Sequence, residues 1–115
     1  FDLSEVSNHI KNYSLAASSS NRYILSFEFK STPSSVGRCA AGTERGFMFL
    51  EFDKEQMFSN HSVYILESCL FNLELSKENT SENGSREYII ENFMSGDNYT
   101  IIADMKNARI ERVDN

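Results

Sequence analysis

Several features that mark other classes of protein are missing from this chain. Its single proline, Pro33, and five glycines are too few for a Pro-rich or Gly-rich linker, and no internal repeat is visible. Apolar runs such as Phe47 to Leu50 have the length of a strand, far below the roughly 18 to 20 residues that cross a bilayer. We therefore expect one domain over residues 1–115, with no membrane insertion within it.

Catalytic signatures are also missing. The chain has no Gly-x-Ser-x-Gly elbow, no His-Glu-x-x-His, no Gly-rich phosphate loop and no Cys-x-x-Cys. A cysteine thiolate paired with His61 is the one conceivable nucleophile and base. The acidic residues do not follow the alternating spacing of a calcium-binding loop. We expect no enzymatic activity, no cofactor and no metal site.

Basic residues are scarce relative to acidic ones, at eleven against seventeen, so the formal net charge is -6. Such a surface repels phosphate backbones, and nucleic acid is therefore not an expected partner. Hydrophobic residues nevertheless make up 40% of the chain and aromatic ones 12%, above the profile of a disordered chain. The sequence predicts a folded domain.

The two cysteines, Cys39 and Cys69, are compatible with either buried thiols or a disulfide. Five Asn-x-Ser/Thr sequons favour the disulfide, because they are more than the roughly two that chance would supply and they indicate a secretory route. Their asparagines are Asn12, Asn60, Asn79, Asn83 and Asn98. We expect a secreted or cell-surface protein, glycosylated best at Asn79 and Asn83, which lie in a wholly polar segment.

Alternation of apolar and polar residues predicts strands along most of the chain. The clearest is Tyr23 to Phe29, with every second side chain aromatic or aliphatic. The other expected strands are Gly46 to Phe52, Val63 to Leu75, Glu87 to Ile90, Tyr99 to Ala103 and Arg109 to Val113. The fold class is therefore all-β, and the strand count suits a two-sheet antiparallel sandwich.

The N-terminal fifteen residues allow two interpretations. Four apolar residues recur at helical spacing behind Asp2 and Glu5, which favours a short N-terminal helix; they are Leu3, Val6, Ile10 and Tyr13. The alternative is a first strand that begins near residue 12.

One segment, Tyr88 to Ala103, resembles the passage from strand E to strand F of fibronectin type III domains. Phe93 takes the place of the buried leucine, Ser95-Gly96 the place of the turn, and Tyr99 the place of the tyrosine-corner residue, whose hydroxyl bonds to upstream backbone. The resemblance covers about sixteen residues. The strand B tryptophan of that family is absent, and Phe27 or Phe29 would have to fill its volume. The resemblance implies an immunoglobulin- or fibronectin-III-like sandwich that recognises partners outside the cell.

Three functions compete at this stage. The first is a non-catalytic recognition or adhesion module whose partner is a protein or cell-surface ligand, with contacts from the loops Ser31 to Gly46 and Asp53 to Ser62. The second is a glycan-shielded coat or secreted antigen, with a composition similar to that of parasite surface antigens and no specific partner. The third is a small β-barrel that carries a ligand, for which the abundance of Phe and Tyr is the support.

Overall fold

The computed structural model describes residues 13–30, 39, 42–55 and 57–114. All regular structure in these residues is β-strand, so the all-β class is confirmed. The strands are β1 Tyr13–Ser19, β2 Arg22–Lys30, β3 Thr43–Phe52, β4 Phe58–Ser68, β5 Leu73–Thr80, β6 Ser85–Asn92, β7 Asn98–Asp104 and β8 Arg109–Asp114. Tyr13, the last residue of the predicted N-terminal helix, lies in β1, which agrees with the alternative of a first strand; residues 1–12 lie outside the described residues.

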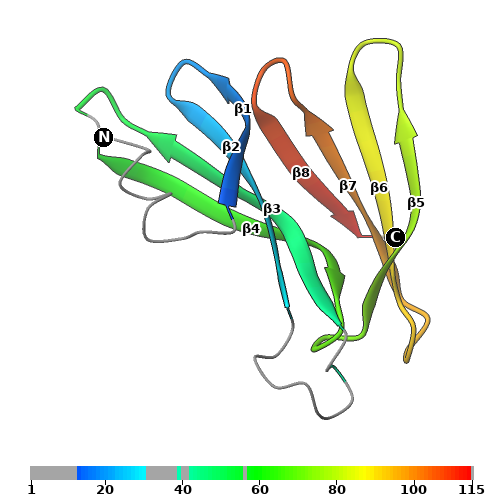
Figure 1. The fold of residues 1–115 in the computed structure, drawn as a ribbon. Coiled ribbons are helices and arrows are strands. Elements are labelled where there is room, and N and C mark those ends of the chain that lie inside the picture. The colour runs from blue at the N-terminus through cyan, green and yellow to red at the C-terminus, as the bar shows by residue number, and fades with distance from the viewer. Residues whose placement is uncertain (1–12, 31–38, 40–41, 56, 115) are drawn as a thin grey trace.

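The eight strands form a single antiparallel sheet in the order of the chain, from β1 to β8 (Figure 1). Every described pairing joins a strand to the next one in sequence. An immunoglobulin or fibronectin type III sandwich instead distributes its strands over two sheets with Greek-key connections. The two-sheet sandwich is therefore not confirmed, and the observed order is that of a meander.

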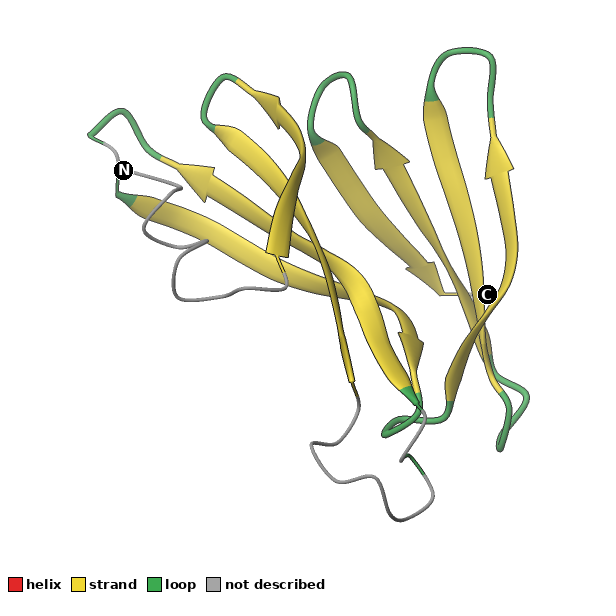
Figure 2. Ribbon diagram, viewed as in Figure 1, coloured by secondary structure: helices red, strands yellow, loops and turns green. Residues whose placement is uncertain are grey.

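The sheet bends sharply between β4 and β5. These two strands share one pair only, Ser68 with Leu73, whereas each other neighbouring pair is joined over at least six positions. From this corner the N-terminal half, β1 to β4, and the C-terminal half, β5 to β8, diverge (Figure 2). The N-terminal and C-terminal halves of one continuous sheet thus form two layers that face each other.

Apolar side chains from both halves meet on the inner face of the bend. Ile24, Ile90 and Ile101 are fully buried there, and the rings of Phe47 from β3 and Tyr88 from β6 meet edge to face with centroids 5.5 Å apart. Burial of this shared face is the main force that keeps the halves together, at about 25 cal/mol per Å² of apolar surface removed from water.

Hydrogen bonds to backbone carbonyls also cross between the halves. The Tyr99 hydroxyl donates to the carbonyl of Ile65 at 2.6 Å, and the Tyr64 hydroxyl donates to that of Ile110 at 3.3 Å. At the far end from the corner, the Arg22 guanidinium donates to the carbonyl of Asn107 at 3.2 and 2.9 Å. This last contact places the β1–β2 turn beside the β7–β8 turn, as Figure 1 shows.

The prediction of one strand from Val63 to Leu75 is wrong. β4 ends at Ser68, and residues 69–72 form a tight turn in which Asn72 has a φ of 61°. Asparagine tolerates this left-handed conformation better than most residues do. The polar segment expected as a loop is also partly strand, because β5 continues to Thr80 and β6 begins at Ser85.

Covalent and polar contacts hold the corner. Cys69 in the turn forms the predicted disulfide with Cys39, with Cα atoms 5.8 Å apart. The buried carboxylate of Glu44 accepts hydrogen bonds from the Ser68 hydroxyl and from the Cys69 backbone N–H, the latter at 2.9 Å. The Ser68 hydroxyl in turn accepts from the Phe71 N–H at 3.0 Å. A buried carboxylate requires such donors, since its burial is otherwise unfavourable.

Reduction of the disulfide should destabilise the domain. Its cysteines are 30 positions apart, and opening a loop of that length returns about 3 to 4 kcal/mol of chain entropy to the unfolded state. We expect the thermal midpoint to fall by on the order of 10 °C. Calorimetry of the oxidised and the reduced, thiol-blocked protein measures this, with the double variant Cys39→Ser and Cys69→Ser as a second form. Equal midpoints would contradict it.

Candidate functional site: a cleft between the two halves

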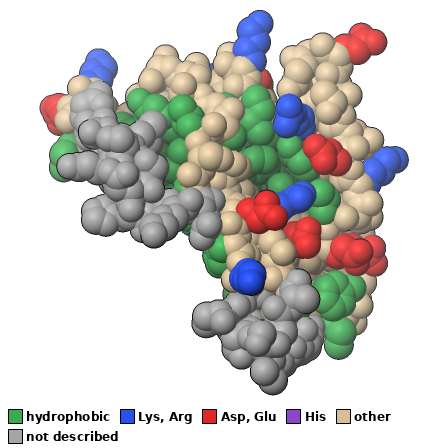
Figure 3. Space-filling view, in the orientation of Figure 1, with side chains coloured by type: hydrophobic (Ala, Val, Ile, Leu, Met, Phe, Trp, Pro, Cys, Tyr) green, Lys and Arg blue, Asp and Glu red, His purple; other side chains and the backbone are tan. Residues whose placement is uncertain are grey.

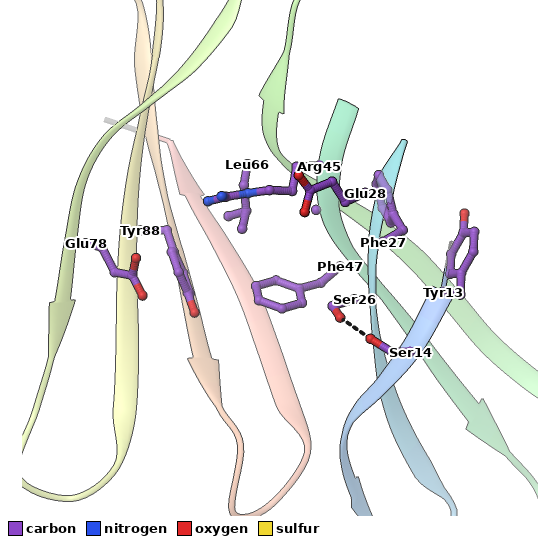
Figure 4. Close-up of a pocket in the computed structure, with 11 residues that line it drawn as sticks. Tyr13, Ser14, Ser26, Phe27, Glu28, Arg45, Phe47, Leu66, Glu78 and Tyr88 are labelled. Atoms are coloured by element: carbon purple, nitrogen blue, oxygen red, sulfur yellow. Dashed lines mark hydrogen bonds between the residues drawn. The ribbon is translucent and has the colours of Figure 1, made fainter. Parts of the chain in front are cut away.

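An open cleft of about 500 Å³ lies between the two halves of the sheet. Six of the eight strands line it, and Figure 4 shows their side chains around a common space. The lining residues are Tyr13 and Ser14 of β1, Ser26, Phe27 and Glu28 of β2, Arg45, Gly46 and Phe47 of β3, Leu66 of β4, Glu78 of β5 and Tyr88 of β6. A concave site of this size suits a small organic molecule.

The floor of the cleft is apolar. Phe47, Leu66 and Tyr88 line it and are all nearly fully buried, since they also belong to the core between the halves. Because the core positions these side chains, the floor is formed without any ligand. In the space-filling view, hydrophobic side chains lie in the middle of the molecule between the two halves, and charged side chains border them (Figure 3).

Close approach of β3 and β4 depends on a glycine in the cleft wall. A Cβ atom on Gly46 would lie 2.3 Å from the Tyr64 carbonyl oxygen and 2.9 Å from the Phe27 ring. Real Cβ atoms do not come this near to backbone oxygen. The register of the β3–β4 pairing shifts between Arg45 and Gly46. The glycine therefore lies where the β3–β4 ladder is irregular.

Among the described residues that line the cleft, Arg45 is the one cation. Its side chain leaves β3 above Leu66 and points toward Tyr88 and Glu78 on the opposite half (Figure 4). Its guanidinium forms no ion pair or hydrogen bond with another described residue, although Glu28 is its cross-strand neighbour on β2. An arginine placed in this way has its five donors available for a bound carboxylate or similar group.

Hydroxyl groups line the β1 and β2 side of the cleft. Ser14 and Ser26 are hydrogen bonded to each other at 2.8 Å, as the dashed line in Figure 4 shows. Across from them, Glu78 extends from β5. The cleft thus combines an apolar floor with hydroxyl, guanidinium and carboxylate groups around it.

Tyr99, expected as a tyrosine-corner residue, lies buried at the start of β7. Its hydroxyl bonds to backbone on β4, on the other half of the sheet, rather than to backbone a few residues upstream as in the fibronectin corner. The Arg112 guanidinium carbon lies 4.0 Å from the centre of its ring. Burial raises the pKa of the Tyr99 phenol above its ordinary value of 10.0; Arg112 lowers that pKa and Asp114 raises it.

The predicted glycosylation sites lie on the surface wherever the structure describes them. Asn60 on β4, Asn79 on β5, Asn83 in the β5–β6 turn and Asn98 on β7 are all exposed, and Asn12 lies outside the described residues. Each described sequon can therefore carry a glycan without unfolding. None of the four described asparagines lines the cleft.

The remaining sequence-predicted residues do not assemble into a site. Both cysteines are consumed by the disulfide, so no thiolate exists for His61, which is exposed on β4. Of the loops expected to make contacts, residues 31–38 fall outside the described residues. In the second loop, expected from Asp53 to Ser62, the residues from Phe58 onward belong to strand β4.

Sequence reasoning missed the cleft residues. Phe47 and Tyr88 lie in predicted strands, but nothing in the sequence shows that they face each other from different halves. The one usable signal is Arg45, a charge just before the apolar run Phe47 to Leu50. Because β3 also carries Glu44 and Glu51, the sequence gives Arg45 no more prominence than other charges.

No protein-family model, curated protein or solved structure matched the chain. In the part of the chain that the structure describes, no helix is long and apolar enough to span a membrane, and no group of three or more His, Cys, Asp or Glu residues is placed to hold a metal ion.

The buried phenol of Tyr99 should make stability fall at alkaline pH. The unfolded chain releases the phenol proton near pH 10.0, whereas the folded protein keeps it to higher pH. The stabilising contribution is therefore complete below that pH and is lost as the pH rises through the folded-state pKa. We expect the free energy of unfolding to drop as the pH rises above about 9, and the drop to be smaller in Tyr99→Phe.

Denaturant unfolding at a series of pH values measures this effect. At neutral pH, Tyr99→Phe should lose about 1 kcal/mol because the Ile65 carbonyl loses its donor. Tyr64→Phe serves as the matched control, since it removes the other hydroxyl that crosses between the halves and keeps Tyr99. If the alkaline loss were the same in Tyr99→Phe as in the wild type, Tyr99 would not be its source.

Proposed function

We propose that this chain is an extracellular domain that binds a small molecule with an apolar body and a charged head. The observation that carries the proposal is the open cleft of about 500 Å³, with an apolar floor and an arginine that no described residue engages. The next-neighbour strand order is also that of up-and-down barrels that hold small ligands, which supports the proposal by analogy only. This proposal corresponds to the third function considered from the sequence, that of a ligand carrier.

The charges of the cleft favour a carboxylate head. A guanidinium donates two parallel hydrogen bonds to a carboxylate, and the apolar body would then rest on Phe47, Leu66 and Tyr88. Glu28 and Glu78 weaken such binding because they carry the same charge as the ligand. The balance predicts a preference for anions that grows when a rim carboxylate is neutralised.

An extracellular location is supported by two observations. The disulfide at the corner is typical of an oxidising compartment, and the four described sequon asparagines are exposed. Strands place successive side chains on opposite faces, so Asn79 points away from the cleft that its neighbour Glu78 lines. Glycans at Asn79 would therefore leave the cleft accessible.

Adhesion, the function implied by the fibronectin type III resemblance, is the second candidate. It is favoured by large apolar side chains that remain exposed on turns near the corner. Binding at those turns and binding in the cleft involve different residues, so one does not exclude the other.

Binding of an apolar anion to the cleft can be measured directly. We expect anilinonaphthalene sulfonate to gain fluorescence with the folded protein, and decanoate to displace it roughly tenfold more effectively than decanol, because a charge-assisted hydrogen bond to Arg45 holds the carboxylate. Arg45→Gln should remove this preference. Glu78→Gln should strengthen decanoate binding, since it removes a repelling charge from the rim.

Matched controls make the result specific to the cleft. Arg86→Gln removes an exposed arginine on β6 that does not line the cleft, and it should leave the preference for decanoate unchanged. Thermal midpoints measured in parallel exclude dye binding to partly unfolded protein. Equal displacement by decanoate, decanol and decylammonium in the wild type would sink the proposal.

The glycan-shield alternative makes a separate prediction. Glycopeptide mapping of protein secreted from eukaryotic cells should find Asn79 and Asn83 occupied, because both lie on an exposed hairpin. Dye and decanoate binding should be the same before and after the glycans are trimmed. Full occupancy of all sequons together with a cleft that becomes accessible only after trimming would favour a shielding coat instead.

A further inference from the structure

Four large apolar side chains are exposed at the corner end of the molecule. Leu70 and Phe71 belong to the β4–β5 turn and are 53% and 62% exposed; Phe93 and Met94 belong to the β6–β7 turn and are 49% and 71% exposed. Phe93 therefore does not take the buried leucine position that the fibronectin type III resemblance implied. We call these four residues the apolar tip. Soluble proteins rarely place several such side chains together in water unless they contact a partner.

Hydrogen bonds join the two turns of the apolar tip. The Phe93 backbone N–H donates to the carbonyl of Asn72 at 3.0 Å, and the Asn92 side-chain amide donates to the carbonyl of Phe71 at 3.5 Å. Residues more than twenty positions apart in the sequence therefore present their apolar side chains from one joined surface.

The β6–β7 turn is also fixed internally by Asn92. Its side-chain oxygen accepts hydrogen bonds from the backbone N–H groups of Met94 at 2.9 Å and Ser95 at 3.0 Å, and its backbone carbonyl accepts from Gly96 at 2.8 Å. Gly96 has a φ of 82°, which glycine adopts without strain. A turn fixed before binding loses little conformational entropy when it docks, so its apolar side chains contribute more of their burial to affinity.

Acidic groups lie beside the part of the apolar tip that Phe93 forms. Glu74 and Glu91 are direct cross-strand partners on β5 and β6, and both are exposed. Like charges in this arrangement destabilise a sheet. Glu67 and Glu74 also line a hollow of about 270 Å³ together with Phe93. Figure 3 shows acidic side chains beside hydrophobic ones at this end of the C-terminal half.

We propose that the apolar tip docks into a partner protein whose binding surface is an apolar socket ringed by lysine or arginine side chains. Charge complementarity selects this occupant, because a cationic ring relieves the repulsion between Glu74 and Glu91 while the socket covers the exposed side chains. An anionic membrane surface is disfavoured, since it would repel the same carboxylates. The apolar tip contains none of the residues that line the cleft, although Phe71 and Arg45 border one hollow of about 220 Å³.

The test uses two synthetic peptides as probes. One has a leucine and phenylalanine face flanked by lysines, and the other is identical except for glutamates in place of the lysines. Amide resonances of the isotope-labelled, disulfide-intact domain are followed by NMR during titration. We expect the lysine peptide to shift amides of residues 69–74 and 91–97, with an affinity that falls as salt is added. The glutamate peptide should cause no such shifts.

Two methionines provide a matched pair of variants. Met94→Gln should weaken binding of the lysine peptide roughly five- to tenfold, whereas Met57→Gln, at a methionine that is 63% exposed away from the apolar tip, should have no effect. Glu74→Gln should weaken binding roughly two- to fivefold while it raises the thermal midpoint by about 1 to 4 °C, because it removes the like-charge pair. A purely structural role for Glu74 would not produce this opposite pair of changes.

Three outcomes would overturn the proposal. One is that both peptides bind equally or shift amides elsewhere. Another is concentration-dependent dimerisation that Met94→Gln abolishes, which would make a second copy of the chain the occupant. The third is binding to neutral phosphatidylcholine vesicles that depends on Met94 while the lysine peptide does not bind, which would make the occupant a lipid surface.

Discussion

The contact between the two halves of the sheet across their bend is the interaction on which the rest of the structure depends. β4 and β5 share a single pair at the corner, so the ladder of backbone hydrogen bonds does little to fix the angle between the halves. That angle is set instead by the buried inner face, in which Phe47 meets Tyr88, and by hydroxyls such as that of Tyr99 that reach backbone on the opposite half. The cleft is the part of this interface that side chains do not fill.

Because β4 and β5 share only one backbone pair, the corner between them is held mainly by other contacts. The disulfide ties residue 39 to the turn, and the Glu44 carboxylate collects donors from Ser68 and Cys69 on the same turn. The buried Glu44 carboxylate therefore finds its hydrogen-bond donors within the corner itself. The neighbouring β6–β7 turn is then attached to the corner through Phe93 and Asn72, which keeps the apolar tip in one piece. The disulfide that stabilises the fold and the hydrogen bond that positions the apolar tip thus both involve the β4–β5 turn.

Alternation of apolar and polar residues predicted those strands whose burial depends on neighbouring residues in the sequence. The alternation around Tyr23 to Phe29 predicted β2, and the two apolar faces of Gly46 to Phe52 fit β3, whose Phe47 packs in the inner core while Leu50 and Phe52 pack in a second cluster. The same rule failed at Val63 to Leu75, because alternation continues through a turn whose only local signal is Asn72. Sequence pattern also supports a sandwich and a bent meander equally, since both bury one face of each strand. The cleft depends on that choice and could not be predicted.

The cleft and the apolar tip depart from local rules in different ways. At the cleft, Arg45 extends over an apolar floor without a described partner, and at the tip Met94 is held in solvent by a turn whose hydrogen bonds are satisfied. Folding alone requires neither arrangement, because a neutral residue in place of Arg45 or a polar residue in place of Met94 would satisfy the same strand and turn geometry. The two features are neighbours, because Arg45 of the cleft and Phe71 of the apolar tip line one hollow of about 220 Å³. A bent meander with an opening on its inner face and exposed turns at its corner can therefore offer both of the surfaces that we propose bind partners.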